Sequence, residues 1–521
     1  MSPTKLRIAI CIQRLSGGGV GGLTCAVALS RCSDVHVDVY EAAAEFTEVG
    51  AGIGVWPRTW KILCSLGLAD DLRKIAIVPP TDEPKVAFHF RKGDQASGVD
   101  FHTLVTPGGM LAFHRADFHA VLLRHLSSRC RTFTRKRLAS YHQSTSSSHN
   151  PISLRFHDGT TATCDLLIGA DGVKSATRRI FVEELSAAAR TKGRGDIARR
   201  CLDAGSPKWS GTLAYRAIIP SDKLRLLLPN HRVLENPMVY FGKNTVMPPS
   251  TQQLTVYPIA RGKLINFAAM RARYDREYTT FDQPWVQDAP LDELLGDFEQ
   301  WEPEVQALIK SIEKVNRWAI HTTLPLPSFV SGRVALLGDA AHAMMPYQGS
   351  GAGQAIEDAY VLSAVLSDPR TTRTTLERAL HAYDAVRRPF ALRVQESSRE
   401  NGLLYTLNYP GLTFDSPHPG GTTRTPLSTT NSIPSPYHPS SHPHLQLGPG
   451  GVGSSGNSGS NSSQKTALHV PGQSQQADER KLAEIRARIQ RNWKWAWETT
   501  VDADLQRALR MLSDTGPLRS V

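Results

Sequence analysis

A short apolar strand, a glycine-rich turn, an apolar helix and a strand that ends in an acid follow one another at the start of the chain. They are LRIAI at residues 6–10, GGGVGG at 17–22, LTCAVALSRC at 23–32 and VHVDVYE at 35–41. Strand, helix and strand in this order predict a βαβ unit, in which both strands lie parallel in one sheet and helices cover its faces. The chain therefore favours an α/β fold over an all-helical or an all-antiparallel one.

The glycine turn also predicts a ligand. Gly17, Gly19 and Gly22 match the pattern G-x-G-x-x-G, which lets a backbone approach a pyrophosphate and points helix-start amides at its charge. Glu41 ends the second strand about twenty residues later, where a carboxylate accepts hydrogen bonds from ribose hydroxyls. Together these features predict a dinucleotide site. The alternative is a glycine-rich surface turn with a solvated Glu41.

One local feature conflicts with this pattern. Six residues, CIQRLS at 11–16, separate the predicted strand from the first glycine, whereas the fingerprint requires the turn to follow the strand at once. Either these residues bulge out and the glycine loop still forms, or the working protein lacks them.

The rest of the chain alternates between two kinds of pattern. Short strands fill 138–171, strand-like runs that predict a separate antiparallel sheet fill 209–281, and a strand, a glycine loop and a long helix from 375 to about 407 follow. We predict the following domains: 5–208, first part of the dinucleotide-binding unit; 209–283, a middle β-sheet substrate domain; 284–408, second part of the binding unit and the long helix; 409–477, a disordered insert; 478–515, C-terminal helices.

The insert at 409–477 is rich in Ser, Pro, Gly, Thr, Asn and His. Such a composition buries too little apolar area to offset the entropy lost on ordering. Helical periodicity then returns, and we expect this last helix to pack on the body through one face: Leu482, Ile485, Ile489, Trp493 and Trp497.

Charge and composition limit the partners. The 521 residues include 60 Lys and Arg against 48 Asp and Glu, a net charge of +12, but the basic residues are dispersed and the densest cluster is only Arg135, Lys136 and Arg137. We therefore expect no nucleic-acid partner and no metal site. Because the sequence has neither a signal-peptide pattern nor a run of apolar residues that could span a bilayer, we expect an intracellular, cytoplasmic protein.

Several motifs together resemble a known family. They are GGGVGG, FTEVGAGIGVWPRTWKIL at 46–63, FHRADF at 113–118, DLLIGADGVKSATRR at 165–179 and GRVALLGDAAHAMMPYQGSGAGQAIEDA at 332–359. They are similar to those of the FAD-dependent aromatic hydroxylases, or class A flavoprotein monooxygenases, and most of all to the salicylate-hydroxylase-like enzymes of fungi. The resemblance covers about 5–408 and 478–513. It implies a Rossmann-like FAD-binding domain with an inserted, mainly antiparallel substrate domain and C-terminal helices.

The resemblance also implies the cofactor contacts. Asp339 resembles the carboxylate that hydrogen-bonds the ribityl chain, Arg115 the arginine near the pyrophosphate and ribose, and Gly54 a backbone contact. Asp171 is similar to the residue of a turn shared between FAD and the transient nicotinamide cofactor, and the amides at the start of the helix with Ala352 face the pyrimidine end of the flavin. The full predicted set is Gly17, Gly19, Gly22, Glu41, Gly54, Arg115, Asp171, Asp339, Gly351 and Ala352. For each residue the alternative is a helix cap or a surface ion pair.

Two residues of the middle sheet resemble groups that anchor phenolates. Arg216 in GTLAYR and Tyr257 in LTVYP occupy these positions, on strands that we expect to be neighbours. A buried guanidinium lowers the pKa of a phenol, and the phenolate is the electron-rich form that attacks an electrophilic oxygen. The alternative is an ordinary pair on a sheet surface. The segment 244–256 is also several residues longer than in similar sequences, which bears on the alignment of Tyr257.

The implied activity is a monooxygenase that uses NADH or NADPH, FAD and O2 to hydroxylate a phenolic or aromatic acid substrate through a C4a-hydroperoxyflavin, with or without loss of CO2. One rival is a protein that keeps the fold only for binding, because the inserts spoil the site. A second rival is a flavin halogenase, but the nearest match to its W-x-W-x-I-P segment, WKWAW at 493–497, lacks Ile-Pro.

Overall fold

The computed structural model describes residues 4–13, 18–46, 52–144, 150–243, 251–412 and 471–514. Three predictions therefore fall wholly or partly outside the described residues: the role of Gly17, residues 14–16 of the insertion 11–16, and the disordered insert over 413–470.

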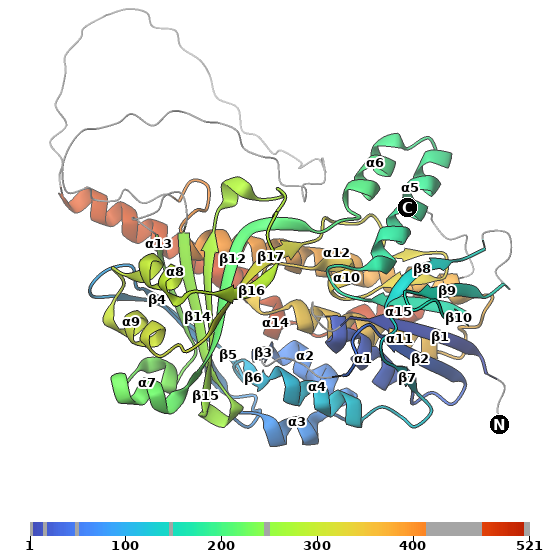
Figure 1. Cartoon of the computed structure of the whole chain (residues 1–521), viewed down its shortest axis with the longest axis horizontal. Coiled ribbons are helices and arrows are strands. Elements are labelled where there is room, and N and C mark those ends of the chain that lie inside the picture. The colour runs from blue at the N-terminus through green and yellow to red at the C-terminus, as the bar shows by residue number, and fades with distance from the viewer. Residues whose placement is uncertain are drawn as a thin grey trace, which may run out of the picture.

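A mainly parallel sheet forms one half of the molecule (Figure 1). In spatial order its described strands are β18 (Val330–Ser331), β19 (Val334–Leu336), β11 (Leu166–Ala170), β1 (Leu6–Ile12), β2 (Val35–Glu41) and β7 (Arg131–Phe133). All neighbours are parallel except β18 and β19. The predicted βαβ unit is thus confirmed, with β1 at the centre of the sheet.

The central strand is longer than predicted. Cys11 and Ile12 pair with Tyr40 and Glu41 of β2 and with the end of β11, so they continue the strand instead of starting an insertion. Both side chains are buried. A cysteine and a β-branched residue fit a central strand that is covered on both faces. The prediction that the strand ends at residue 10 is therefore wrong.

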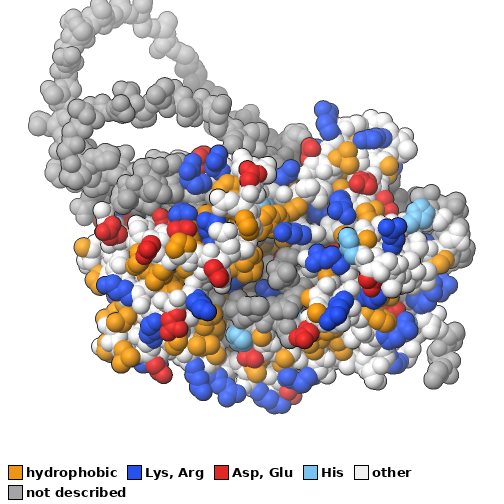
Figure 2. Space-filling model, viewed as in Figure 1, with side chains coloured by type: hydrophobic (Ala, Val, Ile, Leu, Met, Phe, Trp, Pro, Cys, Tyr) orange, Lys and Arg blue, Asp and Glu red, His pale blue; other side chains and the backbone are white. Residues whose placement is uncertain are grey.

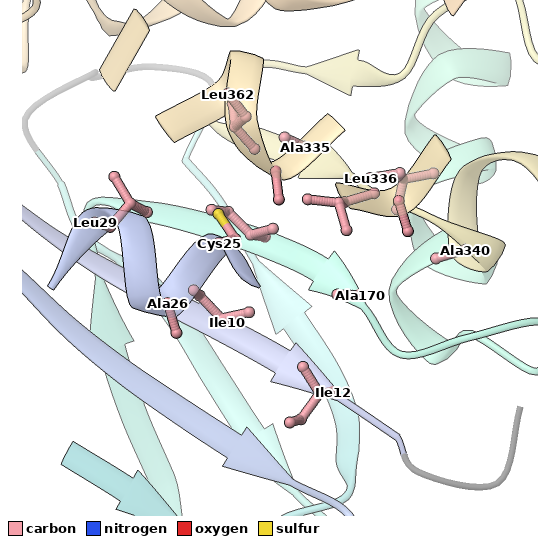
Figure 3. Packing of buried hydrophobic residues seen from close by; sticks show 14 of the residues in the cluster. Ile10, Ile12, Cys25, Ala26, Leu29, Ala170, Ala335, Leu336, Ala340 and Leu362 are labelled. Carbon is pink, nitrogen blue, oxygen red and sulfur yellow. The ribbon is translucent and has the colours of Figure 1, made fainter. Parts of the chain in front are cut away.

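Helices cover the parallel sheet on both faces. The described helices of this half are α1 (Gly18–Leu29), α2 (Pro57–Ser65), α3 (Ala69–Ile75), α4 (Arg115–Arg124), α5 (Ala176–Thr191), α6 (Gly195–Asp203), α10 (Asp339–His342), α11 (Gly351–Ser367), α12 (Leu376–Tyr405) and the short turn η5 (Pro346–Gln348). Figure 3 shows how Ile10 and Ile12 of β1 pack near Cys25 and Ala26 of α1. This packing is the main core of the molecule.

The second half is an antiparallel sheet. In spatial order its described strands are β16 (Val286–Ala289), β17 (Val315–Thr322), β12 (Lys208–Pro220), β15 (Leu264–Ala272), β14 (Thr251–Ile259), β13 (Met238–Lys243), β4 (Pro84–Lys92) and β5 (Val99–Pro107). The predicted strands of 209–281 are all present. The sheet nevertheless extends beyond the predicted range 209–283, because β4 and β5 come from earlier in the chain and β16 and β17 from later.

The two faces of this sheet have different neighbours. Tyr215 and Ala217 belong to a core with the helices α7 (Ser221–Leu227), α8 (Leu291–Phe298) and α9 (Pro303–Lys310), whereas Ala214 belongs to a core with Trp56 and Met345 of the other half. Successive side chains of a strand point to opposite faces. Residues 214, 216 and 218 therefore face the parallel-sheet half.

The remaining described strands form two smaller sheets. They are β8 (Leu138–His142), β9 (Ile152–Phe156) and β10 (Thr161–Cys164), and a pair formed by β3 (Gly52–Val55) and β6 (Leu111–His114). The pair β3 and β6 matters for the site, because Gly52 donates its N–H to Asn266 Oδ1 of β15 at 3.0 Å and so ties the two halves together.

The C-terminal helices pack on the body as predicted. They are α13 (Pro471–Trp493), α14 (Trp495–Glu498) and α15 (Asp502–Met511). Ile485, Ile489 and Trp493 are at most 2% exposed, and they join a core with Trp56. The helix begins at Pro471, earlier than the predicted residue 478. Among the described residues, none of the helices is both long and apolar enough to cross a membrane.

Candidate active site

The carboxyl ends of β1, β2 and β11 meet at one edge of the parallel sheet. The chain passes from β1 to β2 on one side, whereas β11 lies on the other side of β1, so this edge is a topological switch point. Ligands of open α/β sheets bind in the crevice outside such a point. A cavity of about 130 Å³ lies here, lined by Cys11, Ile12, Gln13, Ala42, Lys136, Arg137, Leu138, His157, Asp171, Lys174, Ala176 and Arg179.

The lining of this cavity is basic. It contains four cationic side chains, Lys136, Arg137, Lys174 and Arg179, and one carboxylate, that of Asp171. On the face drawn in Figure 2, Lys and Arg side chains are also present, but they are spread among acidic ones. A concentration of positive charge at a strand-end crevice favours anionic groups such as phosphates.

The glycines of α1 allow close packing. A Cβ at Gly22 would lie 2.2 Å from Ile12 Cγ2 and 3.1 Å from Ala170 Cβ, so only glycine lets the helix start this close to β1 and β11. Gly19 lies in the first turn of the same helix, and Gly17 lies outside the described residues. The helix therefore begins beside the strand end, as a pyrophosphate-binding turn requires.

Glu41 lies where the pattern predicts. It ends β2, pairs with Ile12 of β1, and is 1% exposed. Its Oε1 accepts the Ala43 N–H at 2.7 Å, which holds the carboxylate in one orientation at the strand end. This position suits a ribose contact, which stays a prediction.

Asp339 and the start of α11 lie side by side. A Cβ at Gly351, the first residue of α11, would lie 4.0 Å from Asp339 Oδ1. No donor within the described part of the chain hydrogen-bonds the Asp339 carboxylate, which is only half-buried. It is therefore an acceptor available to a hydroxyl-bearing ligand, next to the helix N-terminus at Ala352.

Arg115 acts on the same carboxylate. Burial raises the pKa of Asp339, and the charges of His342 and Arg115 partly offset that rise. Arg115 is the first residue of α4 and follows β6 directly. The structure thus brings together Arg115, Asp339 and the residues Gly351 and Ala352, which lie more than 200 positions apart from Arg115 in sequence. A flavin nucleotide fits this set, because it presents both hydroxyls and phosphates.

Two other predicted contacts lie in different surroundings. Gly54 lies in β3, and a Cβ there would meet Met110 Sδ at 2.7 Å. Asp171 accepts hydrogen bonds from Ser175 Oγ and, at 3.0 Å, from the Thr177 N–H, so its carboxylate caps α5. Its side chain acts structurally here, and a cofactor contact by Asp171 stays a prediction.

The two residues predicted to hold the substrate, Arg216 and Tyr257, lie on one face of the antiparallel sheet. Arg216 of β12 and Thr255 of β14 both pair with Ala268 of β15, so Tyr257, two residues on, lies on the same face as Arg216. We expected their strands to be neighbours, and this prediction is wrong, because β15 lies between β12 and β14. Burial raises the pKa of Tyr257 to about 12, and the charge of Arg216 partly offsets this rise. Tyr257 therefore stays a hydroxyl donor at neutral pH.

This pair lies against the cofactor half. A Cβ at Gly52 of β3 would lie 2.3 Å from Tyr257 Oη, so the ring packs directly on that strand. Sequence analysis missed two further residues here: Trp318, whose ring centre lies 5.3 Å from Arg216 Cζ, and Asn266, which pairs with Tyr257. The signal for Asn266 was a polar residue within the apolar run LINFAAM.

Comparison with known proteins agrees with this geometry. The family model described as "FAD binding domain" matches residues 15–213 and 298–398. The chain is 39% identical over 424 residues to the FAD-dependent monooxygenase str9 of Strobilurus tenacellus, covering 77% of this chain and 89% of that protein. It is 36% identical over 411 residues to a salicylate hydroxylase of Pseudomonas putida, covering 78% of this chain and 86% of that protein.

A solved structure is similar over the whole chain. The structure titled "Salicylate hydroxylase substrate complex" has a TM-score of 0.71 and 27% identity, and covers 99% of both chains. The family model alone matches more than half of this chain. The chain therefore belongs to the FAD binding domain family and, within it, to the FAD-dependent aromatic monooxygenases that include salicylate hydroxylase.

Proposed function

We propose that this chain hydroxylates a phenol that bears an acidic group, using NADH or NADPH as reductant and O2 as the oxygen source. The observation that carries the proposal is the position of Arg216 and Tyr257 on the sheet face that packs on β3. A cation and a neutral hydroxyl donor on this face would hold a phenolic substrate between the two halves of the molecule.

The residues of the chain have distinct tasks in this reaction. Bound FAD supplies the redox chemistry between the reductant, O2 and the substrate. Arg216 favours the ionised phenol, Tyr257 donates a hydrogen bond, and the ring of Trp318 lies against the guanidinium. Asp339, Arg115 and Glu41 would hold the ribityl chain, the phosphates and the ribose.

The products follow from the position of attack. One oxygen atom of O2 enters the ring and the other leaves as water, while the reductant supplies two electrons. Attack at a carbon that bears hydrogen gives a hydroxylated phenol. Attack at a carbon that bears the carboxylate gives a catechol and CO2.

A screen with matched compounds tests the proposal. Purified protein with FAD is given salicylate, 4-hydroxybenzoate, benzoate or phenol, and NADH and NADPH oxidation, peroxide and product are measured. We expect a phenolic acid to stimulate reductant oxidation and give a product with one added oxygen, whereas benzoate, which has no phenol to ionise, gives none. Peroxide without an oxygenated product from every phenolic acid would contradict the proposal.

A further inference from the structure

A buried cluster of charged side chains lies behind the turn that carries Asp339. Arg58, Glu357, Asp358, Arg387 and His342 are each at most 2% exposed. They come from α2, α11, α12 and α10, and none of them belongs to the set predicted to touch the cofactor. Four full charges in a dry core are costly unless each has a specific partner.

Asp358 accepts hydrogen bonds through both of its carboxylate oxygens. Its Oδ2 accepts the Gly338 N–H at 3.1 Å and His342 Nε2 at 2.6 Å, and its Oδ1 accepts Arg387 Nε at 2.9 Å. Burial alone would raise the pKa of Asp358, but the charges of His342 and Arg387 and these hydrogen bonds lower it. The group is therefore an ionised acceptor.

Two of these partners flank Asp339. Gly338 directly precedes it and has φ +62°, a conformation that glycine adopts without strain, and His342 ends the same short helix. One carboxylate oxygen thus holds both ends of the segment 338–342. Asp358 itself lies seven residues, about two turns, after Gly351 on α11.

We propose that Asp358 is a positioning residue that fixes the Asp339 carboxylate relative to the N-terminus of α11. In the proposed site the flavin lies between the Asp339 segment and α11. Asp358 belongs to α11 and is hydrogen-bonded to the Asp339 segment through Gly338 and His342. The inference deepens the proposed function, because it rests on Asp339 and α11 binding the cofactor.

Glu357 provides a matched control. It is equally buried and belongs to the same charge cluster, but its partners are Arg58, Arg387 and Gln354. It makes no hydrogen bond to the segment 338–342 among the described residues. Glu357→Gln therefore removes the same charge from the same core and leaves the Asp339 segment bonded as before.

The experiment compares Asp358→Asn and Glu357→Gln with the wild type as full-length proteins. The apparent melting temperature without flavin, the Kd for FAD by fluorescence quenching, and the visible circular dichroism of bound flavin are measured. Both variants should have a lower apparent melting temperature than the wild type. Only Asp358→Asn should bind FAD about tenfold or more weakly and change the dichroism of the flavin that remains bound.

Two results would overturn the proposal: an unchanged Kd and flavin spectrum in Asp358→Asn, or equal weakening in Glu357→Gln. If Asp358→Asn does not fold, His342→Leu removes one donor and leaves Gly338 and Arg387 bonded to Asp358. That variant should shift Kd and dichroism in the same direction, and an unchanged value of both would likewise overturn the inference. Wild-type protein that fails to bind FAD would contradict the proposed function itself.

Discussion

Two carboxylates near the strand edge, buried Asp171 and half-buried Asp339, show how hydrogen-bond partners decide the role of an acid. Asp171 has its oxygens engaged by Ser175 and Thr177, so it serves the start of α5. Asp339 has no such hydrogen bond within the described residues, although burial raises its pKa in the same way. An acceptor left open beside a helix N-terminus is the one that a ligand can use.

Asp339→Ala should weaken FAD binding by about 10- to 100-fold, because it removes a charged acceptor for a ribityl hydroxyl. The Kd for FAD, measured by fluorescence titration, checks this. Asp196→Ala, at an exposed acid in the first turn of α6, is the control and should leave the Kd unchanged. Wild-type affinity in folded Asp339→Ala would rule out the predicted contact.

Arg216→Ala should separate flavin chemistry from substrate activation. The variant should keep FAD and still oxidise NAD(P)H, but hydroxylation should fall by about 100-fold, because losing one charged donor in a water-excluded site commonly costs on the order of 3 kcal/mol. The ratio of peroxide to product should rise, and higher pH should partly restore hydroxylation, because bulk hydroxide then supplies the phenolate.

The control for this prediction is Arg225→Ala, at a half-exposed arginine of α7 that pairs with Asp222. It should keep the wild-type ratio of peroxide to product. Normal coupling in Arg216→Ala at neutral pH would refute the role of Arg216 and leave the pair as a feature of the sheet surface.

At the scale of elements, the contact between α1 and α11 depends on a missing side chain. A Cβ at Gly21 would lie 2.5 Å from Leu337 Cδ2 and 2.8 Å from Ala355 Cβ of α11. The two helices that flank the cofactor edge are thereby held close together, and a methyl group at this point would push them apart.

Gly21→Ala should destabilise the protein by about 1–3 kcal/mol through overpacking. Gly296→Ala is the opposite case, because Gly296 lies inside α8 with nothing within 4 Å of the added Cβ. That change should stabilise by about 0.5–1 kcal/mol, since alanine favours the helix. Urea unfolding monitored by far-ultraviolet circular dichroism measures both, and a stable Gly21→Ala would show that the helices can separate without cost.

Elements with a clear local period were predictable from the sequence. The strands of 209–281 and the long helix, observed at Leu376–Tyr405, are examples. The segment 59–75 has one helical period of apolar residues but forms two helices, because Gly67 with φ +66° separates α2 from α3. Pairing between β4 and β13 was not predictable, because no local pattern encodes which distant strand lies alongside.

The site was predictable to the same extent. Glu41, Arg115 and Asp339 stand in motifs with fixed spacing, so their approximate positions followed from the resemblance. The roles of Asn266, Trp318 and Asp358 depend on which face of an element meets which neighbour. Three-dimensional packing decides which face meets which neighbour. For Asp358, the only signal in the sequence was a pair of acids in QAIEDA, within an otherwise apolar helix.

At the scale of the whole molecule, the C-terminal helices hold the turn before α11. Gln348 of η5 donates to the Asn492 carbonyl at 2.8 Å, and Trp493 Nε1 donates to Tyr405 Oη at 3.1 Å. Arg58, which also donates to Glu357 of α11, donates to Thr499 Oγ1 at 2.7 Å. Residues 471–514 are thus packed on the half of the molecule that contains the parallel sheet.

A protease site placed within 440–445 tests this docking. After cleavage the two pieces should elute together in gel filtration and keep FAD, because the buried face of α13 joins them. The same cut in Trp493→Ala should release the C-terminal piece, since truncating a buried tryptophan costs about 3–5 kcal/mol. Separate elution of the wild-type pieces would show that the docking is weak.

The order of strands in the parallel sheet also bears on how the protein is made. β1 comes before the other described strands in the chain, whereas its neighbour β11 begins only at residue 166 and the next strand, β19, only at residue 334. At about 5–20 residues per second, β1 has one open edge for about 8–30 s during synthesis. A cofactor site that uses Asp339 and the start of α11 can therefore be complete only after residue 351 has been made, long after its first strand.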